Sequence, residues 1–415
     1  MVTMNDFHKI TGFEWEIPRK TRKDLRVGIH VFASQEMLLK GLKDRSFEQA
    51  MNAATLPGLV GEVVVMPDFH QGYGFPIGVV LATKGVVIPN AVGVDIGCGM
   101  CAMKTSITDI KKPELQSIID LIKQRVPVGF KHQEKDQDES LMPDIDYSET
   151  TIIKQEYKSA LRQIGTLGGG NHFIELQMGS DGCLWVMIHS GSRNLGKKVA
   201  DHYNKIAVKM NELWFSEVEK SKELAFLPIQ TKEARDYINE MNYCVAFALA
   251  NRKLMMERIG QSIVDVIPSA LFIAFEGNTI TNIAHNYAKW EHHFNSDVIV
   301  HRKGATSAKV GEIGIIPGSM GTKSYIVEGL GNPESFMSCS HGAGRKMGRK
   351  QAQRELNLEH EIEVMNNQDI IHEIKNIEDL DEAAGAYKDI DTVMENQKDL
   401  VKIRVELKPL AVVKG

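Results

Sequence analysis

Residues 93–100 read Gly93-Val-Asp95-Ile-Gly-Cys98-Gly-Met100, and they follow three short apolar, β-branched runs at 62–66, 78–82 and 85–88. Such runs, separated by glycine, predict strands joined by tight loops. An Asp and a Cys three residues apart in a glycine-rich loop can bring a carboxylate and a thiolate to one point, a mixed donor set suited to manganese, zinc or iron. The same residues are equally consistent with a purely structural role, in which a tight turn surrounds a buried cysteine.

The rest of the chain alternates between strand-like and helix-like stretches. Apolar spacing predicts a helix within 106–126 and a second one beginning in the basic stretch Arg345–Arg354, and the polar, acidic residues 131–150 predict a surface loop. Further strands are expected at 173–176, 184–188, 268–275, 296–300, 400–407 and 411–413. Residues 195–265 are charged and helix-periodic. The sequence therefore predicts one α+β domain over residues 1–415, with a helical insertion at about 195–265.

Composition excludes several classes of protein. The chain has 415 residues, 43% of them hydrophobic and 25% charged, which is ordinary for a globular protein. Five cysteines, an odd number, fit reduced thiols better than a disulfide framework. No signal peptide and no apolar stretch of about 18 residues is evident, so we expect a cytoplasmic protein without a membrane span. A net charge of −5 limits any RNA contact to a local basic patch, such as Arg19–Arg26 or Arg345–Arg354.

Three histidines occur where strands are expected to end beside glycine-rich loops. His172 follows Gly165-Thr-Leu-Gly-Gly-Gly170 and Asn171, His189 precedes Ser190-Gly-Ser-Arg193, and His285 lies in Asn282-Ile-Ala-His285-Asn286. A single histidine of this kind is more often a hydrogen-bonded structural residue. Two of them, each flanked by Gly and by Ser or Asn, favour metal ligands or catalysts instead.

A fourth histidine, His341, lies among small residues in Ser338-Cys-Ser-His341-Gly-Ala-Gly-Arg345. An accessible imidazole can act as a nucleophile toward phosphorus, and Arg345 is placed to neutralise a phosphate. A glycine-rich helix cap is the structural alternative. The loop Pro317–Ser324 has the composition of a phosphate cradle without P-loop spacing. The Lys-x-Asp-Gly motif of ordinary nucleic-acid ligases is absent, so a nucleotide transfer would need histidine in place of lysine.

Eight short motifs occur in one order along the chain. They are Met66-Pro-Asp68-Phe-His70, Gly93–Met100, Gly168-Gly-Gly-Asn171-His172-Phe, His189-Ser-Gly-Ser-Arg193, Ile316-Pro-Gly-Ser319-Met-Gly, Ser338–Arg345, Tyr387-Lys-Asp-Ile-Asp391 and Val413-Lys414-Gly415. Together they resemble the RtcB family of RNA-splicing ligases. The resemblance spans about 350 residues and implies a single large RtcB-like domain, with mixed sheets around a central metal and nucleotide cleft.

The resemblance also implies site residues and cofactors. Two Mn²⁺ ions are expected, one held by Cys98, His172 and His189 and the other by Asp95, Cys98 and His285, with the Cys98 thiolate bridging. His341 is expected to attack the α-phosphate of GTP. The nucleotide is expected to contact Asn171, His172, Glu175, Ser319, Ser324, His341, Gly342, Ala343, Gly344, Tyr387 and Lys414. Glu175 can accept the ring N–H and amino hydrogens of guanine, which adenine does not offer in that arrangement, so GTP is expected over ATP.

The implied reaction is ligation of RNA. GMP would pass from His341 to an RNA 3′-phosphate, giving an RNA-ppG end, and a 5′-hydroxyl would displace it; a 2′,3′-cyclic phosphate would first be hydrolysed. The resemblance admits an archease-type activator, and we expect a monomer, acting in tRNA splicing or RNA repair. The chain departs from the family pattern at Ala284, where many members have His.

Two other functions compete with ligation. A metal phosphoesterase would stop after hydrolysing cyclic-phosphate ends and would not need His341. A non-catalytic RNA-binding paralogue would need neither the nucleophile nor the metal ligands, all of which this chain retains.

Overall fold

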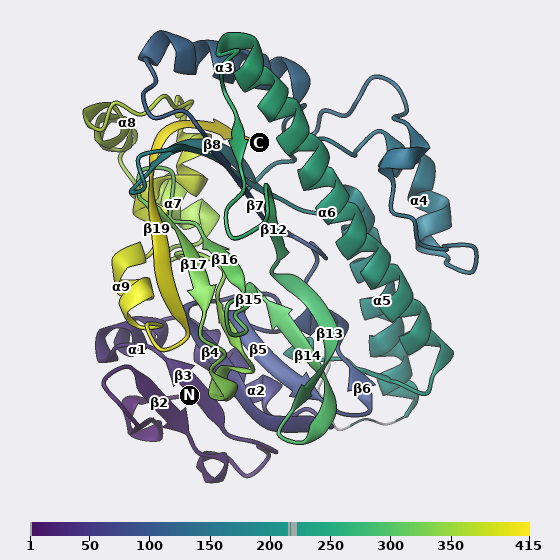
Figure 1. Ribbon diagram of the computed structural model, residues 1–415. Coiled ribbons are helices and arrows are strands. Elements are labelled where there is room, and N and C mark those ends of the chain that lie inside the picture. The colour runs from purple at the N-terminus through teal and green to yellow at the C-terminus, as the bar shows by residue number, and fades with distance from the viewer. Residues whose placement is uncertain (1, 215, 217–221) are drawn as a thin grey trace.

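The computed structural model describes residues 2–214, 216 and 222–415, which form two large sheets flanked by helices (Figure 1). The first sheet has seven strands in the order β1 (His8–Lys9), β2 (Glu14–Ile17), β3 (Ile29–Phe32), β4 (Leu59–His70), β5 (Ile77–Thr83), β14 (Ser296–Lys303) and β13 (Asn286–His293). Within it β3 and β4 run parallel and the other neighbours antiparallel, so the sheet is mixed.

The second sheet has eight strands, and it contains the chain end. Its order is β11 (Phe272–Ile273), β7 (Gly99–Thr105), β9 (Leu184–Ser190), β8 (Phe173–Gly179), β19 (Val401–Lys414), β17 (Ser324–Gly329) and β16 (Ile313–Ile316), with β12 (Thr281–Ala284) also paired to β7. Two small ladders join β6 (Val86–Val87) to β10 (Leu227–Pro228), and β15 (Ala305–Ser307) to β18 (Ser338–Ser340).

The helices cover the outside of these sheets. They are α1 (Gln35–Gly41), α2 (Ser46–Ala53), α3 (Lys112–Arg125), α4 (Ile152–Leu161), α5 (Arg193–Leu213), α6 (Lys232–Val266), α7 (Arg349–Glu355), α8 (Leu358–Asn367) and α9 (Ile390–Glu395). Short 3-10 turns are η1 (Met4–Asp6), η2 (Arg19–Thr21), η3 (Pro89–Ala91), η4 (Glu139–Leu141), η6 (Pro333–Ser335), η7 (Ile377–Glu382) and η8 (Ala384–Ala386). The α+β fold class is thereby confirmed.

The longest helix, α6, links the helical side of the molecule to the second sheet. It begins at Lys232, and its N-cap is Thr231, whose side chain accepts a hydrogen bond from the Ala234 N–H and so satisfies a free amide. It packs on α3, α5, β7 and β9. Both α5 and α6 lie in the stretch expected to be helical at 195–265, of which residues 215 and 217–221 are outside the described part of the chain.

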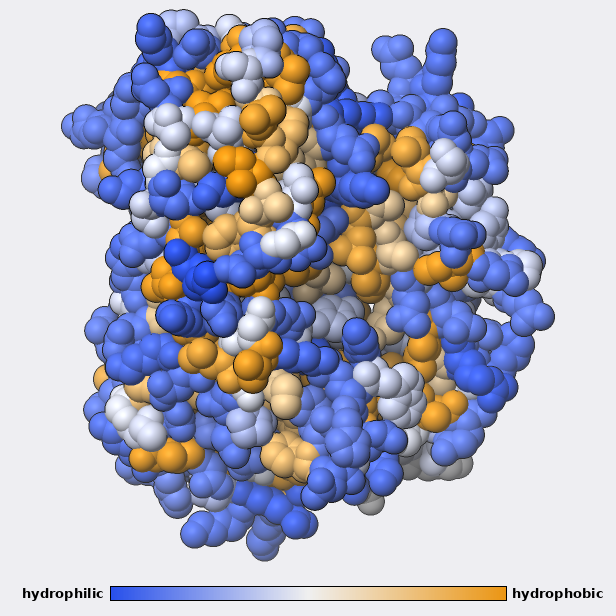
Figure 2. Space-filling view, viewed as in Figure 1, coloured by the Kyte–Doolittle hydropathy of each residue, from blue (hydrophilic) through white to orange (hydrophobic). Residues whose placement is uncertain are grey.

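Buried hydrophobic side chains form the cores beneath the helices and between the sheets, whereas hydrophilic residues cover most of the face in Figure 2. No helix in the described ranges combines the length and the apolar character needed to cross a bilayer. The strands predicted within 62–66, 78–82, 173–176, 184–188 and 296–300 are all present.

One local prediction was wrong. The expected strand at 268–275 is reduced to two residues, because Pro268 lies in a turn and Phe275 closes a tight hairpin with Asn278. The helix predicted to begin in the basic stretch Arg345–Arg354 is present as α7, and it begins at Arg349 because the backbone of Arg345 forms a bridge with Tyr387. The two runs predicted at the C-terminal end are one strand, β19, with a register shift between Pro409 and Ala411.

Candidate functional site

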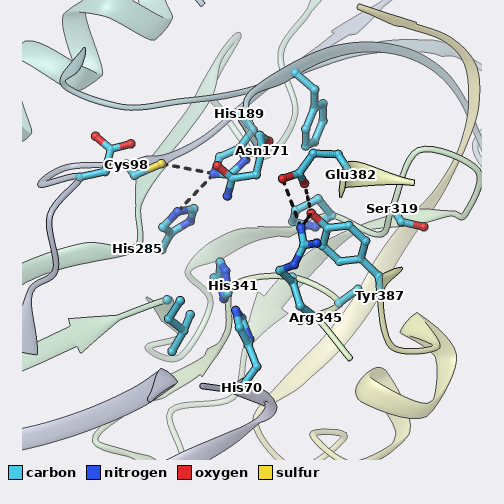
Figure 3. A pocket seen from close by; sticks show the side chains of 18 of the residues that line it. His70, Cys98, Asn171, His189, His285, Ser319, His341, Arg345, Glu382 and Tyr387 are labelled. Atoms are coloured by element: carbon cyan, nitrogen blue, oxygen red, sulfur yellow. Dashed lines mark hydrogen bonds and ion pairs between the residues drawn. The ribbon is translucent and has the colours of Figure 1, made fainter. Parts of the chain in front are cut away.

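A cavity of about 440 Å³ lies where segments of both large sheets meet, and four of the histidines singled out from the sequence lie in or beside it (Figure 3). The loop before β7 provides Asp95 and Cys98, and the end of β9 provides His189. His285 lies between β12 and β13, and His341 follows β18. Side chains from His70 to Lys414 thus line one cavity.

Sulfur, nitrogen and oxygen donors converge at one side of this cavity. The Cys98 Sγ atom lies 3.3 Å from His189 Nε2 and 3.5 Å from His172 Nε2. His172 Nε2 is 3.1 Å from an Asp95 carboxylate oxygen, and His189 Nε2 is 3.4 Å from His285 Nε2. Thiolate, imidazole and carboxylate at this spacing are a donor set for a borderline-soft divalent cation.

Backbone carbonyls fix the orientation of two of these imidazoles. His172 Nδ1 lies 2.9 Å from the Leu167 carbonyl, and His189 Nδ1 lies 2.9 Å from that of Asn171. A carbonyl only accepts hydrogen bonds, so each Nδ1 carries the hydrogen and each Nε2 directs its lone pair toward Cys98. Burial lowers the pKa of His189 and of His285 well below the ordinary value, so both are neutral and able to bind a metal.

The donor atoms divide into two groups, Asp95–Cys98–His172 and Cys98–His189–His285, with all atoms of a group within 4.8 Å of one another. The resemblance implied a different division, with His172 beside His189 and Asp95 beside His285. Cys98 is common to both groups in either division. One oxygen of Asp95 is buried without a hydrogen-bond partner. A buried carboxylate oxygen of this kind is suited to bind a cation. The residues therefore fit a two-metal site.

The Cys98 thiol is not ionised by its protein surroundings alone. Burial and the neighbouring Asp95 carboxylate raise its pKa well above the ordinary value. A thiol of this kind loses its proton when a cation binds, so metal binding and proton release are coupled.

His341 pairs with an acid to which the sequence had given no role. Its Nδ1 lies 2.5 Å from the carboxylate of Asp68, which is fully buried and also accepts the N–H groups of His341 (3.0 Å) and Gly342 (3.3 Å). Burial acts to raise the pKa of Asp68, but the charge and hydrogen bond of His341 hold it below its ordinary value. The carboxylate thus keeps the hydrogen on Nδ1 and leaves Nε2 free to attack.

The pair lies next to the metal donors. The ring of His341 is 4.8 Å from that of His285, centroid to centroid. The sequence drew attention to Asp68 only through the motif Met66-Pro-Asp68-Phe-His70. An acid at the end of an apolar run does not show which distant residue it will contact in the fold. Close approach requires glycine at Gly344, where φ is +71° and a Cβ atom would lie 2.0 Å from the Asp68 carbonyl.

The residues expected around the nucleotide mostly line the same cavity. Those present are Asn171, Glu175, Ser319, His341, Gly342, Ala343, Gly344, Tyr387 and Lys414. Ser324 is not among the lining residues: it is buried, and its hydroxyl accepts hydrogen bonds from Gln177 (3.2 Å) and the Gly318 N–H (3.1 Å). His172 is not among the lining residues either.

Glu175 is a buried carboxyl group within this cavity. Burial raises its pKa to about 8, while a hydrogen bond from Gln177 (2.6 Å) and the charge of Lys414 act in the opposite direction. Because this carboxyl group is shielded from water, hydrogen bonds from the N–H groups of a ligand would stabilise it strongly.

Arg345 lines the cavity, but its charge is already paired. Its guanidinium lies 3.2 Å from the Glu382 carboxylate and 3.2 Å from the Tyr387 hydroxyl (Figure 3). Arg349 lies 3.1 Å from the same carboxylate. Glu382 was missed in the sequence, because it lies in an acidic stretch that carries no motif. Arg345 can neutralise a phosphate only if it shares its charge with Glu382.

Comparison with known proteins now identifies the family. The sequence matches the family described as tRNA-splicing ligase RtcB over residues 49–146 and 142–415. It is 39% identical to the RNA-splicing ligase RtcB of Escherichia coli K12, over 89% of this chain and 93% of that protein. It is 32% identical to the tRNA-splicing ligase RtcB of Thermococcus kodakarensis, over 100% of both chains.

The chain belongs to the RtcB family. The resemblance drawn from the motifs is thereby confirmed, and the family supports RNA ligation as the activity. In this RtcB chain the unusual Ala284 pairs with Gly99 at the edge of the second sheet, directly before His285. A Cβ atom at position 99 would lie 2.7 Å from the Ala284 Cα atom, so the two backbones touch at this point.

Proposed function

We propose that this protein is a GTP- and Mn²⁺-dependent RNA ligase that joins 3′-phosphate or 2′,3′-cyclic phosphate ends to 5′-hydroxyl ends through a histidine–GMP intermediate. The observation that carries the proposal is the pairing of His341 with Asp68 beside the metal donors. The proposal treats residues 1–415 as one cytoplasmic, monomeric ligase domain with a helical insertion at 195–265, open to an archease-type activator.

In the first step Nε2 of His341 attacks the α-phosphorus of GTP, a P–N bond forms, and pyrophosphate leaves. Positive charge develops on the imidazole as its lone pair is used. The Asp68 carboxylate lies 2.5 Å from Nδ1 and stabilises this charge. Asp68 also sets the direction of the lone pair, because its carboxylate accepts the two neighbouring N–H groups of the same loop.

In the second step an oxygen of the RNA 3′-phosphate attacks the GMP phosphorus, and the P–N bond to His341 breaks. Asp68 holds the Nδ1 hydrogen throughout, so the departing imidazole is neutral and not an anion. In the third step the 5′-hydroxyl attacks the 3′-phosphate and GMP leaves. A cyclic phosphate reaches the same route once it has been hydrolysed.

Asp95, Cys98, His172, His189 and His285 would hold the two Mn²⁺ ions in the groups that the distances define. When bound, the ions supply positive charge to phosphoryl oxygens whose negative charge grows during transfer. Thiolate and imidazole are softer donors than Mg²⁺ prefers, so the donor set supports manganese over magnesium.

A ligation assay tests the joining reaction and its dependence on GTP. One RNA with a labelled 3′-phosphate and a second RNA with a 5′-hydroxyl are incubated with GTP and Mn²⁺, and nuclease digestion then locates the label. We expect the labelled phosphate to become the junction phosphodiester, and no product without GTP. Release of the label as inorganic phosphate would identify a phosphoesterase instead, and absence of any change would remove both functions.

Replacing Glu175 by Gln is expected to relax the preference for GTP over ATP. The carboxylate would accept two guanine N–H donors, and a neutral amide turns one of these contacts into a clash between donors. Hydrogen bonds to charged groups contribute about 1.5–3 kcal/mol, on the order of 10- to 100-fold in affinity. Nucleotide-dependent formation of the GMP or AMP adduct measures the preference.

The matched control is Glu363→Gln, which makes the same change at an exposed position of α8 outside the cavity and should leave the preference for GTP unchanged. Unchanged discrimination between GTP and ATP in Glu175→Gln would show that the base lies elsewhere in the cavity.

A further inference from the structure

Lys388 is a partly buried cation whose ammonium group faces main-chain oxygens. Its Nζ atom donates hydrogen bonds to the carbonyl of Pro67, at 3.0 Å, and to that of Phe69, and it lies 3.8 Å from the centroid of the Phe69 ring. Burial lowers the pKa of Lys388 to about 8, against the opposing effect of the Asp68 carboxylate. Burying a cation costs free energy unless hydrogen bonds compensate it, so the two carbonyl contacts of Lys388 stabilise its buried charge.

The two carbonyl groups that Lys388 binds belong to the residues on either side of Asp68. The main-chain N–H of Lys388 donates to the Gly344 carbonyl, at 2.9 Å, in the loop that carries His341. One residue therefore binds both segments that must meet for the Asp68 carboxylate to reach Nδ1 of His341.

The sheet does not fix this part of β4. The pairing of β4 with β5 is regular at Val65 and resumes only at His70, and the pairing with β3 ends at Val65. Residues 66–69 thus have no partner in either ladder, although they carry the acid on which the geometry of the nucleophile depends. Lys388 supplies the hydrogen-bond donors that a neighbouring strand would otherwise provide.

We propose that Lys388 is a positioning residue: its ammonium group fixes the main chain around Asp68 and thereby holds the Asp68 carboxylate against Nδ1 of His341. The proposal rests on the proposed function, in which that contact directs Nε2 at the phosphorus. Lys388 itself touches neither reacting atom. Displacing a catalytic group by about 1 Å costs on the order of 10²-fold in rate.

Lys388→Met retains the length of the side chain but leaves the two carbonyl groups without their donor. We expect single-turnover GMP transfer to His341 to slow about 100-fold at saturating GTP and Mn²⁺. Metal content and GTP affinity are expected to stay at wild-type values, and Lys388→Arg is expected to restore much of the rate. The matched control is Val393→Ala, which removes a buried side chain of α9 from the core cluster that also contains Phe69.

A second readout requires no reaction. The hydrogen on Nδ1 of His341, an atom that lies 2.5 Å from the Asp68 carboxylate oxygen, is expected to give a far-downfield proton resonance that is absent in His341→Ala. We expect this resonance to be lost or shifted upfield in Lys388→Met and kept in Val393→Ala. If Lys388→Met does not fold, Lys388→Leu, which also lacks a donor, is used for the same comparison.

The two measurements separate this proposal from the proposed function. If the wild-type protein forms no GMP adduct, the proposed function fails, and the resonance alone still decides the role of Lys388. If Lys388→Met keeps both the resonance and the transfer rate seen in Val393→Ala, Lys388 serves stability only and the positioning role is overturned.

Discussion

His341→Ala is expected to abolish transfer of GMP to the protein, with the rate falling by a factor on the order of 10⁴ or more. The reason is geometric: of the residues lining the cavity, His341 alone has its Nδ1 atom held by a buried carboxylate while Nε2 is left free. Incubation with α-labelled GTP and Mn²⁺ measures the adduct, which should be labile to acid and stable to alkali, as expected of a phosphoramidate.

The control for this experiment is His292→Ala, which removes an exposed histidine paired with Asp297 on the β13–β14 hairpin. It should form the adduct at the wild-type rate. Metal content should be unchanged in both variants, because His341 is in neither donor group. Label on the protein in His341→Ala would place the nucleophile elsewhere, and the order of steps proposed above would have to be abandoned.

Much of this site was predictable because the sequence shows the kind of donor at each position. Glycine-flanked histidines and the Asp95–Cys98 spacing already indicated ligands, and His341 among small residues indicated an accessible imidazole. The division of the donors into two groups was not predictable. It depends on whether His172 points toward Asp95 or His189, and that is decided by the Leu167 carbonyl, which holds the ring from the other side.

The pairing of His341 with Asp68 could not be predicted from the sequence for a similar reason. Asp68 and His341 are 273 residues apart, and Asp68 follows a run of apolar residues that predicts only a strand. Ser324, which the resemblance placed at the nucleotide, is buried and its hydroxyl accepts a hydrogen bond from Gln177, so its contact with the nucleotide stays a prediction. The strands could be predicted from the local pattern of apolar residues. Which polar residues face the cavity depends on contacts between segments that are far apart in the sequence.

The number of metal ions retained by two single variants tests the bridging position of Cys98. Cys98→Ala removes a donor from both groups and should lose both ions, whereas Asp95→Ala leaves Cys98, His189 and His285 intact and should retain about one ion per chain. Elemental analysis after dialysis against Mn²⁺ gives the stoichiometry directly.

Cys101→Ala provides the matched control for that experiment. Cys101 lies three residues after Cys98, is fully buried in the core beneath the second sheet, and belongs to neither donor group, so its variant should keep both ions. The comparison separates the loss of a bridging metal ligand from the general effect of removing a buried thiol. Equal metal content in Cys98→Ala and Asp95→Ala would mean that the thiolate serves one ion only, and the two groups that share Cys98 would then not be the two metal sites.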